Sequence, residues 1–126
     1  MQSNQPIKSI YDLRIYKLAF DLAMDVFKMS ANFPKEEKYS LTDQVRRSSR
    51  SVAANIREGF AKKHYKKTFT RHLVDALGSS EETITWIEFA LSCGYISEEQ
   101  FNTVIDQHHH LSSMIANFIK KWEEGA

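Results

Sequence analysis

The sequence predicts an all-α protein, folded as an antiparallel up-down-up-down four-helix bundle. Turn-forming residues are scarce, with 4 Gly and 2 Pro in 126 residues, and this favours a few long elements, which are usually helices. Four separate stretches repeat their apolar residues with the 3.6-residue period of a helix. The length fits one ordinary domain, so we expect a single domain over residues 1–126.

The first helix is predicted over about residues 12–31, after a polar, aperiodic lead-in at residues 1–9 that we expect to be loose. Its apolar arc is wider than one core contact requires, so we expect this helix to touch two neighbours or another subunit. Asn32-Phe33-Pro34 ends it, because proline disfavours a helical residue before it. The arc consists of Leu13, Ile15, Tyr16, Leu18, Phe20, Leu22, Ala23, Val26 and Phe27.

The second helix is predicted to start at Ser40, where Asp43 three residues on indicates a weak capping box, and to end near Gly59. A polar stripe borders its apolar one: Gln44, Ser48, Ser51, Asn55 and Glu58. One interpretation is a hydrogen-bonded seam, with Asn55 and Glu58 capping chain ends or pairing with an arginine. The other is an active site with Glu58 as base. The seam is favoured, because the same helix offers no His or Cys nucleophile beside it.

The third helix is predicted over about residues 66–93, with Gly78 in its middle indicating a close backbone approach. Cys93-Gly94-Tyr95 closes it with a left-handed glycine. Trp86 and Phe89 lie off its core stripe, so we expect them at a subunit contact.

The fourth helix is predicted to begin at Ser97, which forms a full capping box with Gln100. It carries His108-His109-His110. Consecutive helical residues diverge by about 100°, so three in a row cannot close on one ion. Asp106 with His110 offers two metal ligands at helical spacing, but a core or interface position for His108 and surface positions for His109 and His110 are favoured. We expect no metal and no cofactor.

Composition excludes several classes of protein. Cys93 is the only cysteine, which rules out an internal disulfide and a cysteine-based zinc site; we expect it to be a small apolar residue near a helix end. The N-terminal residues lack the apolar core and cleavage site of a secretion signal. No apolar run approaches the ~18 residues that span a membrane. We therefore expect a cytoplasmic protein with no membrane partner.

Positive charge is concentrated in one segment. Residues 44–73 contain nine Lys and Arg and a single acid, Glu58, although the whole chain carries only +1. An ordinary solvated surface is one interpretation. The other is a phosphate-contacting surface, with His64 and Tyr65 placed for stacking. Its candidate nucleic-acid-binding residues are Arg46, Arg50, Arg57, Lys62, Lys63, Lys66 and Lys67.

Two motifs carry a family resemblance. The second helix contains Asn55-Ile56-x-Glu58-Gly59, and the third contains Ala76-x-Gly78-Ser79-x-x-Glu82. From Tyr11 to Trp122 the chain resembles the small bacterial proteins encoded within intervening sequences of 23S ribosomal RNA genes. It is also similar to the accessory proteins of diversity-generating retroelements. The motif residues expected to be structural are Gln44, Ser51, Asn55, Glu58, Gly59, Gly78, Ser79 and Glu82.

The resemblance implies a four-helix protomer that assembles into a ring-like homopentamer, and it implies no enzymatic activity. For the retroelement proteins it also implies binding to nucleic acid and to the reverse transcriptase through a basic surface. We therefore expect a non-enzymatic oligomer that binds RNA or DNA. A protein-interaction adaptor with no nucleic-acid role is the alternative, and a salt titration separates the two.

Overall fold

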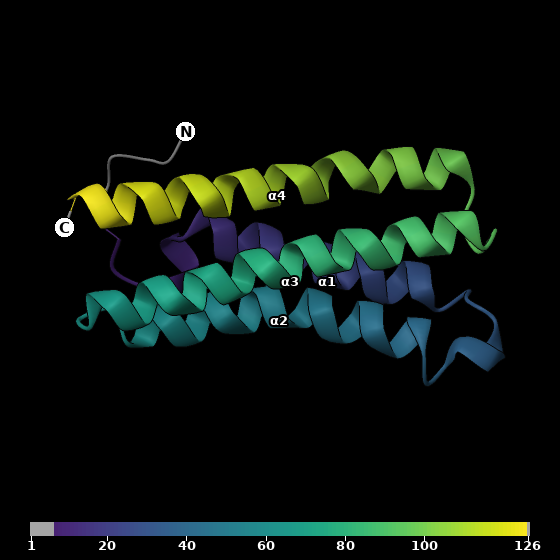
Figure 1. The fold of residues 1–126 in the computed structure, drawn as a ribbon, viewed down its shortest axis with the longest axis horizontal. Helices are drawn as coiled ribbons and strands as arrows, with labels where there is room; N and C mark the ends of the chain where they lie inside the picture. The colour runs from purple at the N-terminus through teal and green to yellow at the C-terminus, as the bar shows by residue number, and fades with distance from the viewer. Residues whose placement is uncertain (1–6, 126) are drawn as a thin grey trace.

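The computed structural model describes residues 7–125, which form four long helices and no strand within that range. The expected all-α bundle is therefore confirmed, and its helices run alternately up and down (Figure 1). Two short 3-10 turns, η1 (Ile10–Asp12) and η2 (Lys35–Glu37), precede the first and second helices. The long helices are α1 (Arg14–Ser30), α2 (Leu41–Ala61), α3 (Lys66–Ser92) and α4 (Glu98–Gly125).

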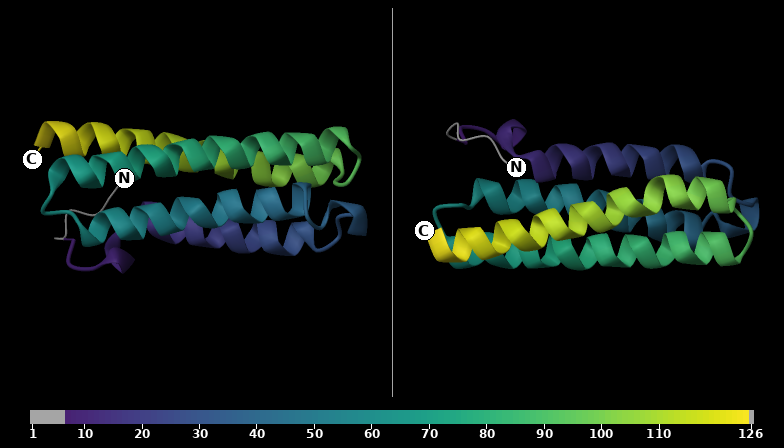
Figure 2. Two further views of the ribbon diagram at one scale, coloured as in Figure 1. Left: turned by 60° about the horizontal axis from the view of Figure 1, so that its bottom comes forward. Right: turned by 90° about the horizontal axis from the view of Figure 1, so that it is seen from above.

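The order of contacts closes the four helices into a bundle. α2 packs against α1 and α3, and α4 packs against α3 and α1. The turn between α2 and α3 lies at the same end as the start of α1 and the end of α4, and the other two connections lie at the opposite end (Figures 1 and 2). The lysine-rich turn therefore lies at one end of an elongated molecule.

The core has two clusters of buried apolar side chains along the bundle. One includes Leu22, Ile56 and Leu73, together with Ile115 of α4. The second lies toward the other end and includes Val45 and Ile87. Because each cluster draws on all four helices, burial of these side chains determines how the helices are turned about their axes.

The wide apolar arc of α1 divides into two halves. Ile15, Leu22 and Val26 are buried in the core, whereas Phe20 and Phe27 remain 50% and 42% exposed. The second half therefore presents an apolar surface that the protomer itself does not cover. None of the described helices has the length and apolarity needed to cross a membrane.

Two of the predicted helix ends are confirmed. The Ser97 N–H donates to Oε1 of Gln100 at 2.8 Å, and the Gln100 N–H donates to Oγ of Ser97 at 3.0 Å. This reciprocal pair is the capping box expected at the start of α4. Gly94 adopts φ 78° after α3, the left-handed conformation that favours glycine at a helix end. Cys93 beside it is exposed, so it is not packed as a small apolar residue.

The predicted capping box at the start of α2 is wrong. Ser40 makes no capping bond to the helix. Instead Oε1 of Glu37 accepts the Leu41 N–H at 3.1 Å and the Ser40 hydroxyl. The turn η2 places this carboxylate at the helix N-terminus, where negative charge is favourable. Hydrogen bonds from Ser40, Tyr95 and the Leu41 N–H hold the pKa of Glu37 below its usual value.

The expected loose lead-in covers residues 1–9, of which residues 1–6 lie outside the described residues. The backbone N–H groups of Lys8 and Ser9 donate to Oδ2 of Asp12 at 2.8 and 3.0 Å. The chain just before η1 is therefore attached to that turn, in contrast to the expectation for this part of the segment.

His108 is buried in α4 and only 2% exposed, while His109 and His110 lie on the surface, as predicted. Burial lowers the pKa of His108 from 6.5 to about 4, with a smaller contribution from His109. The folded state disfavours the charged ring. The contribution of His108 to the free energy of unfolding is therefore complete only above pH 6.5, the pKa of the ring in the unfolded chain. That contribution is lost as the pH falls from 6.5 to about 4.

We predict that the free energy of unfolding falls between pH 6.5 and pH 4 by on the order of 3 kcal/mol on account of this residue. Replacement of His108 by Leu removes this component and flattens the profile, which urea titrations at several pH values measure. His109→Gln is the matched control, since that side chain is exposed and its replacement leaves the profile steep. An unchanged pH dependence in His108→Leu contradicts the prediction.

Candidate nucleic-acid interface

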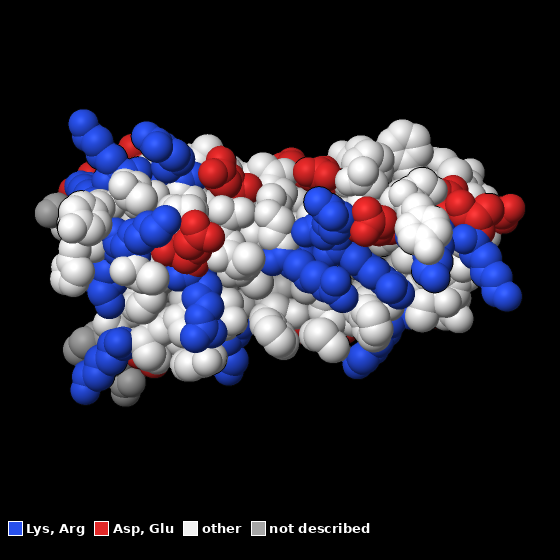
Figure 3. Space-filling model, turned by 90° about the horizontal axis from the view of Figure 1, so that it is seen from below, with Lys and Arg blue, Asp and Glu red and all other residues white. Residues whose placement is uncertain are grey.

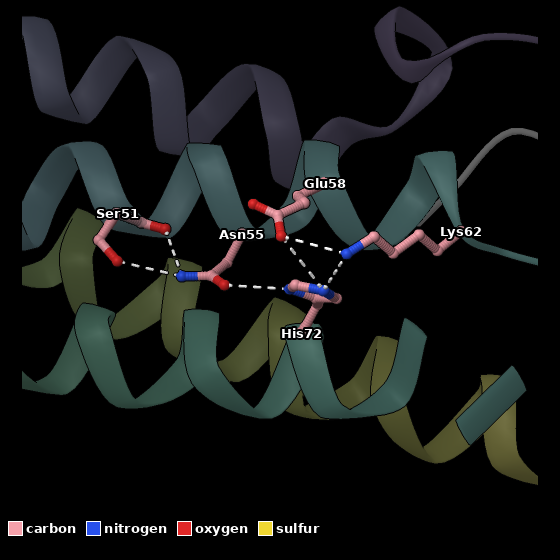
Figure 4. A network of polar contacts seen from close by, with 5 residues as sticks. All are labelled: Ser51, Asn55, Glu58, Lys62 and His72. Atoms are coloured by element: carbon pink, nitrogen blue, oxygen red, sulfur yellow. Dashed lines mark hydrogen bonds and ion pairs between the residues drawn. The ribbon is translucent and has the colours of Figure 1, made fainter. Parts of the chain in front are cut away.

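Hydrogen bonds between polar side chains join α2 to α3 in a polar seam (Figure 4). The polar stripe of α2, with residues three or four positions apart, predicted this seam. Oγ of Ser51 lies 3.0 Å from Oγ of Ser79. The side-chain amide of Asn55 donates to the carbonyl oxygen and hydroxyl of Ser51 at 3.0 and 3.1 Å. Its Oδ1 lies 3.2 Å from Nδ1 of His72. Because the amide nitrogen is engaged, its oxygen faces the ring, and Nδ1 must carry the proton that it donates.

The other nitrogen of His72 lies among charged groups (Figure 4). Nε2 is 3.4 Å from Nζ of Lys62 and 3.6 Å from Oε2 of Glu58. Glu58 also pairs at 3.3 Å with Lys62, four residues further on and directly after the end of α2. The seam thus consists of hydrogen bonds, and at its end Glu58 pairs with Lys62 while Nε2 of His72 lies close to the same carboxylate. An arginine partner or a chain end was expected for Glu58.

Five of the eight motif residues lie at this contact: Ser51, Asn55, Glu58, Gly59 and Ser79. Gln44 and Gly78 are exposed, and the carboxylate of Glu82 accepts the indole N–H of Trp86 at 3.0 Å within α3. His72 is a seam residue that sequence reasoning missed. The available signal was a glycine in α2, which makes room for a larger residue on a neighbouring helix.

The close helix approach predicted at Gly78 occurs at Gly59 instead. Gly59 was expected to end α2, but the helix continues to Ala61 and Gly59 is buried within it. A Cβ on Gly59 would lie 2.6 Å from Cβ of His72 and 2.9 Å from Cδ1 of Phe69. Gly78 was expected at a close approach, yet a Cβ there would meet nothing within 4 Å among the described residues.

The candidate basic residues form two groups. The first, which we call the arginine row, is Arg46, Arg50 and Arg57 on the side of α2 that faces α1. Cζ of Arg46 lies 4.6 Å from the ring centroid of Phe27, and its Nε donates to Oγ of Ser30 at 2.8 Å. The row is therefore held against the aromatic side chains of α1.

The second group, the lysine end, consists of Lys62, Lys63, Lys66 and Lys67 around the α2–α3 turn. Nζ of Lys63 lies 4.0 Å from the ring centroid of Phe60. Nζ of Lys66 donates to the backbone carbonyl of Glu123 at 3.0 Å, near the end of α4. Lys67 is exposed, as are the neighbouring His64 and Tyr65.

The structure does not merge the two groups into one continuous surface. Figure 3 shows basic side chains gathered in separate clusters along one face of the bundle, with uncharged and acidic side chains between them. Arg57 contacts the Tyr11 and Tyr16 hydroxyls near the start of α1, whereas Lys62 contacts His72 of α3. Any long polyanion would therefore contact separate clusters along the bundle.

No metal site is evident within residues 7–125, where no three His, Cys, Asp or Glu side chains come close enough to hold an ion. Asp106 and His110, the pair considered from the sequence, are both exposed.

The fold and these surfaces define a small helical-bundle protein with a polar helix contact and clustered basic side chains. Residues 11–117 match the family described as 23S rRNA-intervening sequence protein, and the chain belongs to this family. A protein with unknown function from the S23 ribosomal protein family from Bacteroides thetaiotaomicron has the same fold in its crystal structure. It has a TM-score of 0.76 and 24% identity, and the match covers 84% of this chain and 95% of that chain. No curated protein matches the chain, and the similarity to retroelement accessory proteins stays a prediction.

We predict opposite effects for alanine at the two helix glycines. Gly59→Ala lowers the free energy of unfolding, because the methyl group must displace the backbone-proximal Cβ of His72. Gly78→Ala raises it by up to about 1 kcal/mol, because alanine is the better helix former and meets no neighbour. Thermal unfolding of the two variants, each a control for the other, measures both. Destabilisation by Gly78→Ala, or none by Gly59→Ala, contradicts this assignment.

Proposed function

We propose that this chain is a non-enzymatic, oligomeric bundle protein that binds nucleic acid through its arginine row and lysine end. One observation carries the proposal. Among the described residues, Lys62 is the only one of these seven cations with an ion-pair partner, Glu58. The other six positive charges are not neutralised by a neighbouring carboxylate, so phosphate groups are suited to supply the counter-charge.

The absence of catalysis in this proposal is supported by the polar seam. Its hydrogen-bonding groups are directed at one another, with Asn55 joining Ser51 to His72. Such a network stabilises the contact between two helices and holds their relative positions.

We predict that the protein binds mixed RNA and DNA at low salt, with log affinity falling by ~0.9 per phosphate contact per log unit of salt on a duplex. Replacing Lys62, Lys63, Lys66 and Lys67 together by Gln lowers the affinity and flattens this slope, with unchanged helical content. Fluorescence anisotropy over a salt series measures both quantities.

The matched control replaces four exposed lysines outside the segment by Gln, which changes the net charge equally: Lys17, Lys28, Lys35 and Lys38. This control variant retains most of the salt dependence of the affinity. Equal effects of the two quadruple variants show attraction by net charge alone. If wild-type protein binds neither RNA nor DNA at low salt, the proposal fails and a protein-interaction adaptor takes its place.

Assembly forms the second part of the proposal, with a pentamer as the state that the family resemblance implies. The support is an aromatic pair on α3 that includes Phe89, which is 52% exposed. The ring centroids of Trp86 and Phe89 lie 5.8 Å apart, so two large aromatic side chains lie together at the surface. Aromatic residues are enriched at protein interfaces.

We predict that light scattering at micromolar concentration gives a multimer for the wild type and a smaller species for Phe89→Asp. Phe89 is a better position for this substitution than Trp86, because Trp86 is half-buried and its indole N–H donates a hydrogen bond to Glu82. Tyr39→Asp, at an aromatic residue of the surface loop before α2, is the control and stays assembled. A monomeric wild type refutes assembly, and an assembled Phe89→Asp places the interface elsewhere.

A further inference from the structure

A surface groove runs between α1 and α2, beside the arginine row. Its volume is about 370 Å³, and every side chain that lines it is apolar or aromatic except for two arginines. Phe20 and Phe27 contribute exposed rings, and Arg50 and Arg57 lie on its α2 side.

The guanidinium groups are held over the aromatic rings at the edge of the groove. Arg46 and Arg50 have Cζ 4.6 and 6.0 Å from the ring centroid of Phe27. Arg57 lies 5.5 and 5.9 Å from the rings of Tyr11 and Tyr16, and its Nη1 donates to their hydroxyls at 3.4 and 3.3 Å. These contacts hold long cationic side chains in place before any ligand arrives, which lowers the entropy cost of binding.

Flat aromatic rings on one side of a groove, with fixed cations on the other, suit a particular ligand chemistry. Unpaired nucleobases stack on aromatic rings and on guanidinium planes, while the phosphates between them attract the cations. In a duplex the base faces are covered by their neighbours, and only phosphates and base edges are offered. Arg50 and Arg57 are seven residues apart, about 10 Å along the helix axis, so the groove has room for a short run of nucleotides.

We propose that this groove binds single-stranded nucleic acid, with one or more bases stacked on Phe20 and its neighbouring rings. The inference rests on the proposed function and deepens it by naming the strand form that is bound. A second copy of the chain is the rival occupant. The strand is favoured by charge, because it brings its own phosphates to three arginines that have no acidic partner among the described residues.

The test uses a fluorescein-labelled oligo(U) of about 15 nucleotides, alone and annealed to oligo(A), in anisotropy titrations at several salt concentrations. The single strand binds more tightly than the duplex at equal salt. Phe20→Ala lowers the single-strand affinity by roughly 5- to 150-fold, the loss of one stacked base. It leaves the salt slope and the duplex affinity unchanged, because no charge is removed. Tyr39→Ala, an exposed aromatic residue outside the groove, retains the wild-type affinity.

A second variant at the same position separates the loss of stacking from misfolding of Phe20→Ala. Phe20→Trp retains a flat ring and the affinity, and bound strand quenches the emission of its added indole beyond the quenching seen in the wild type. Equal affinity for strand and duplex, unchanged affinity in Phe20→Ala, or an unquenched Phe20→Trp overturns the inference while the proposed function stands. Dissociation of the wild-type multimer by Phe20→Ala also overturns it and assigns the groove to a subunit contact. Absence of binding to either form in the wild type defeats the proposed function itself.

Discussion

The close approach of α2 to α3 at Gly59 is the constraint on which the rest of this structure depends. With no side chain at that position, Cβ of His72 packs directly against the α2 backbone. The ring of His72 then reaches Asn55, and the seam of hydroxyls and amides continues to Ser51 and Ser79. Small polar residues serve this contact well, because they allow helices to lie close together and still satisfy their own hydrogen bonds.

This contact also determines what the opposite side of α2 presents. Asn55 and Arg57 are separated by about 200° around a helix axis, so turning Asn55 toward α3 turns Arg57 toward α1. There the apolar arc of α1 is wider than the core covers, and the guanidinium groups lie over its outer rings. The aromatic groove and the arginine row are thus a consequence of the seam, and a shift of α2 about its axis would disturb both together.

The fold was predictable from the sequence because helical periodicity and capping boxes are local signals. The Ser97–Gln100 capping box and the left-handed Gly94 follow from residues only a few positions apart. The candidate site was predictable in part. Periodicity showed that Ser51 and Asn55 share a side of one helix, but the identity of the residue opposite them depends on how two helices meet. His72 was therefore missed, and the close approach was expected at Gly78 rather than at Gly59 for the same reason.

The exposed cysteine after α3 gives this molecule a single chemical handle. Cys93 is the only thiol in the chain and is accessible at the connection between α3 and α4. That connection lies at the end of the bundle opposite the α2–α3 turn (Figure 1). A maleimide dye attached there occupies one defined place on each protomer, remote from the lysine end. The separation of label positions between copies within an assembly would then report their arrangement by energy transfer, without any engineered substitution.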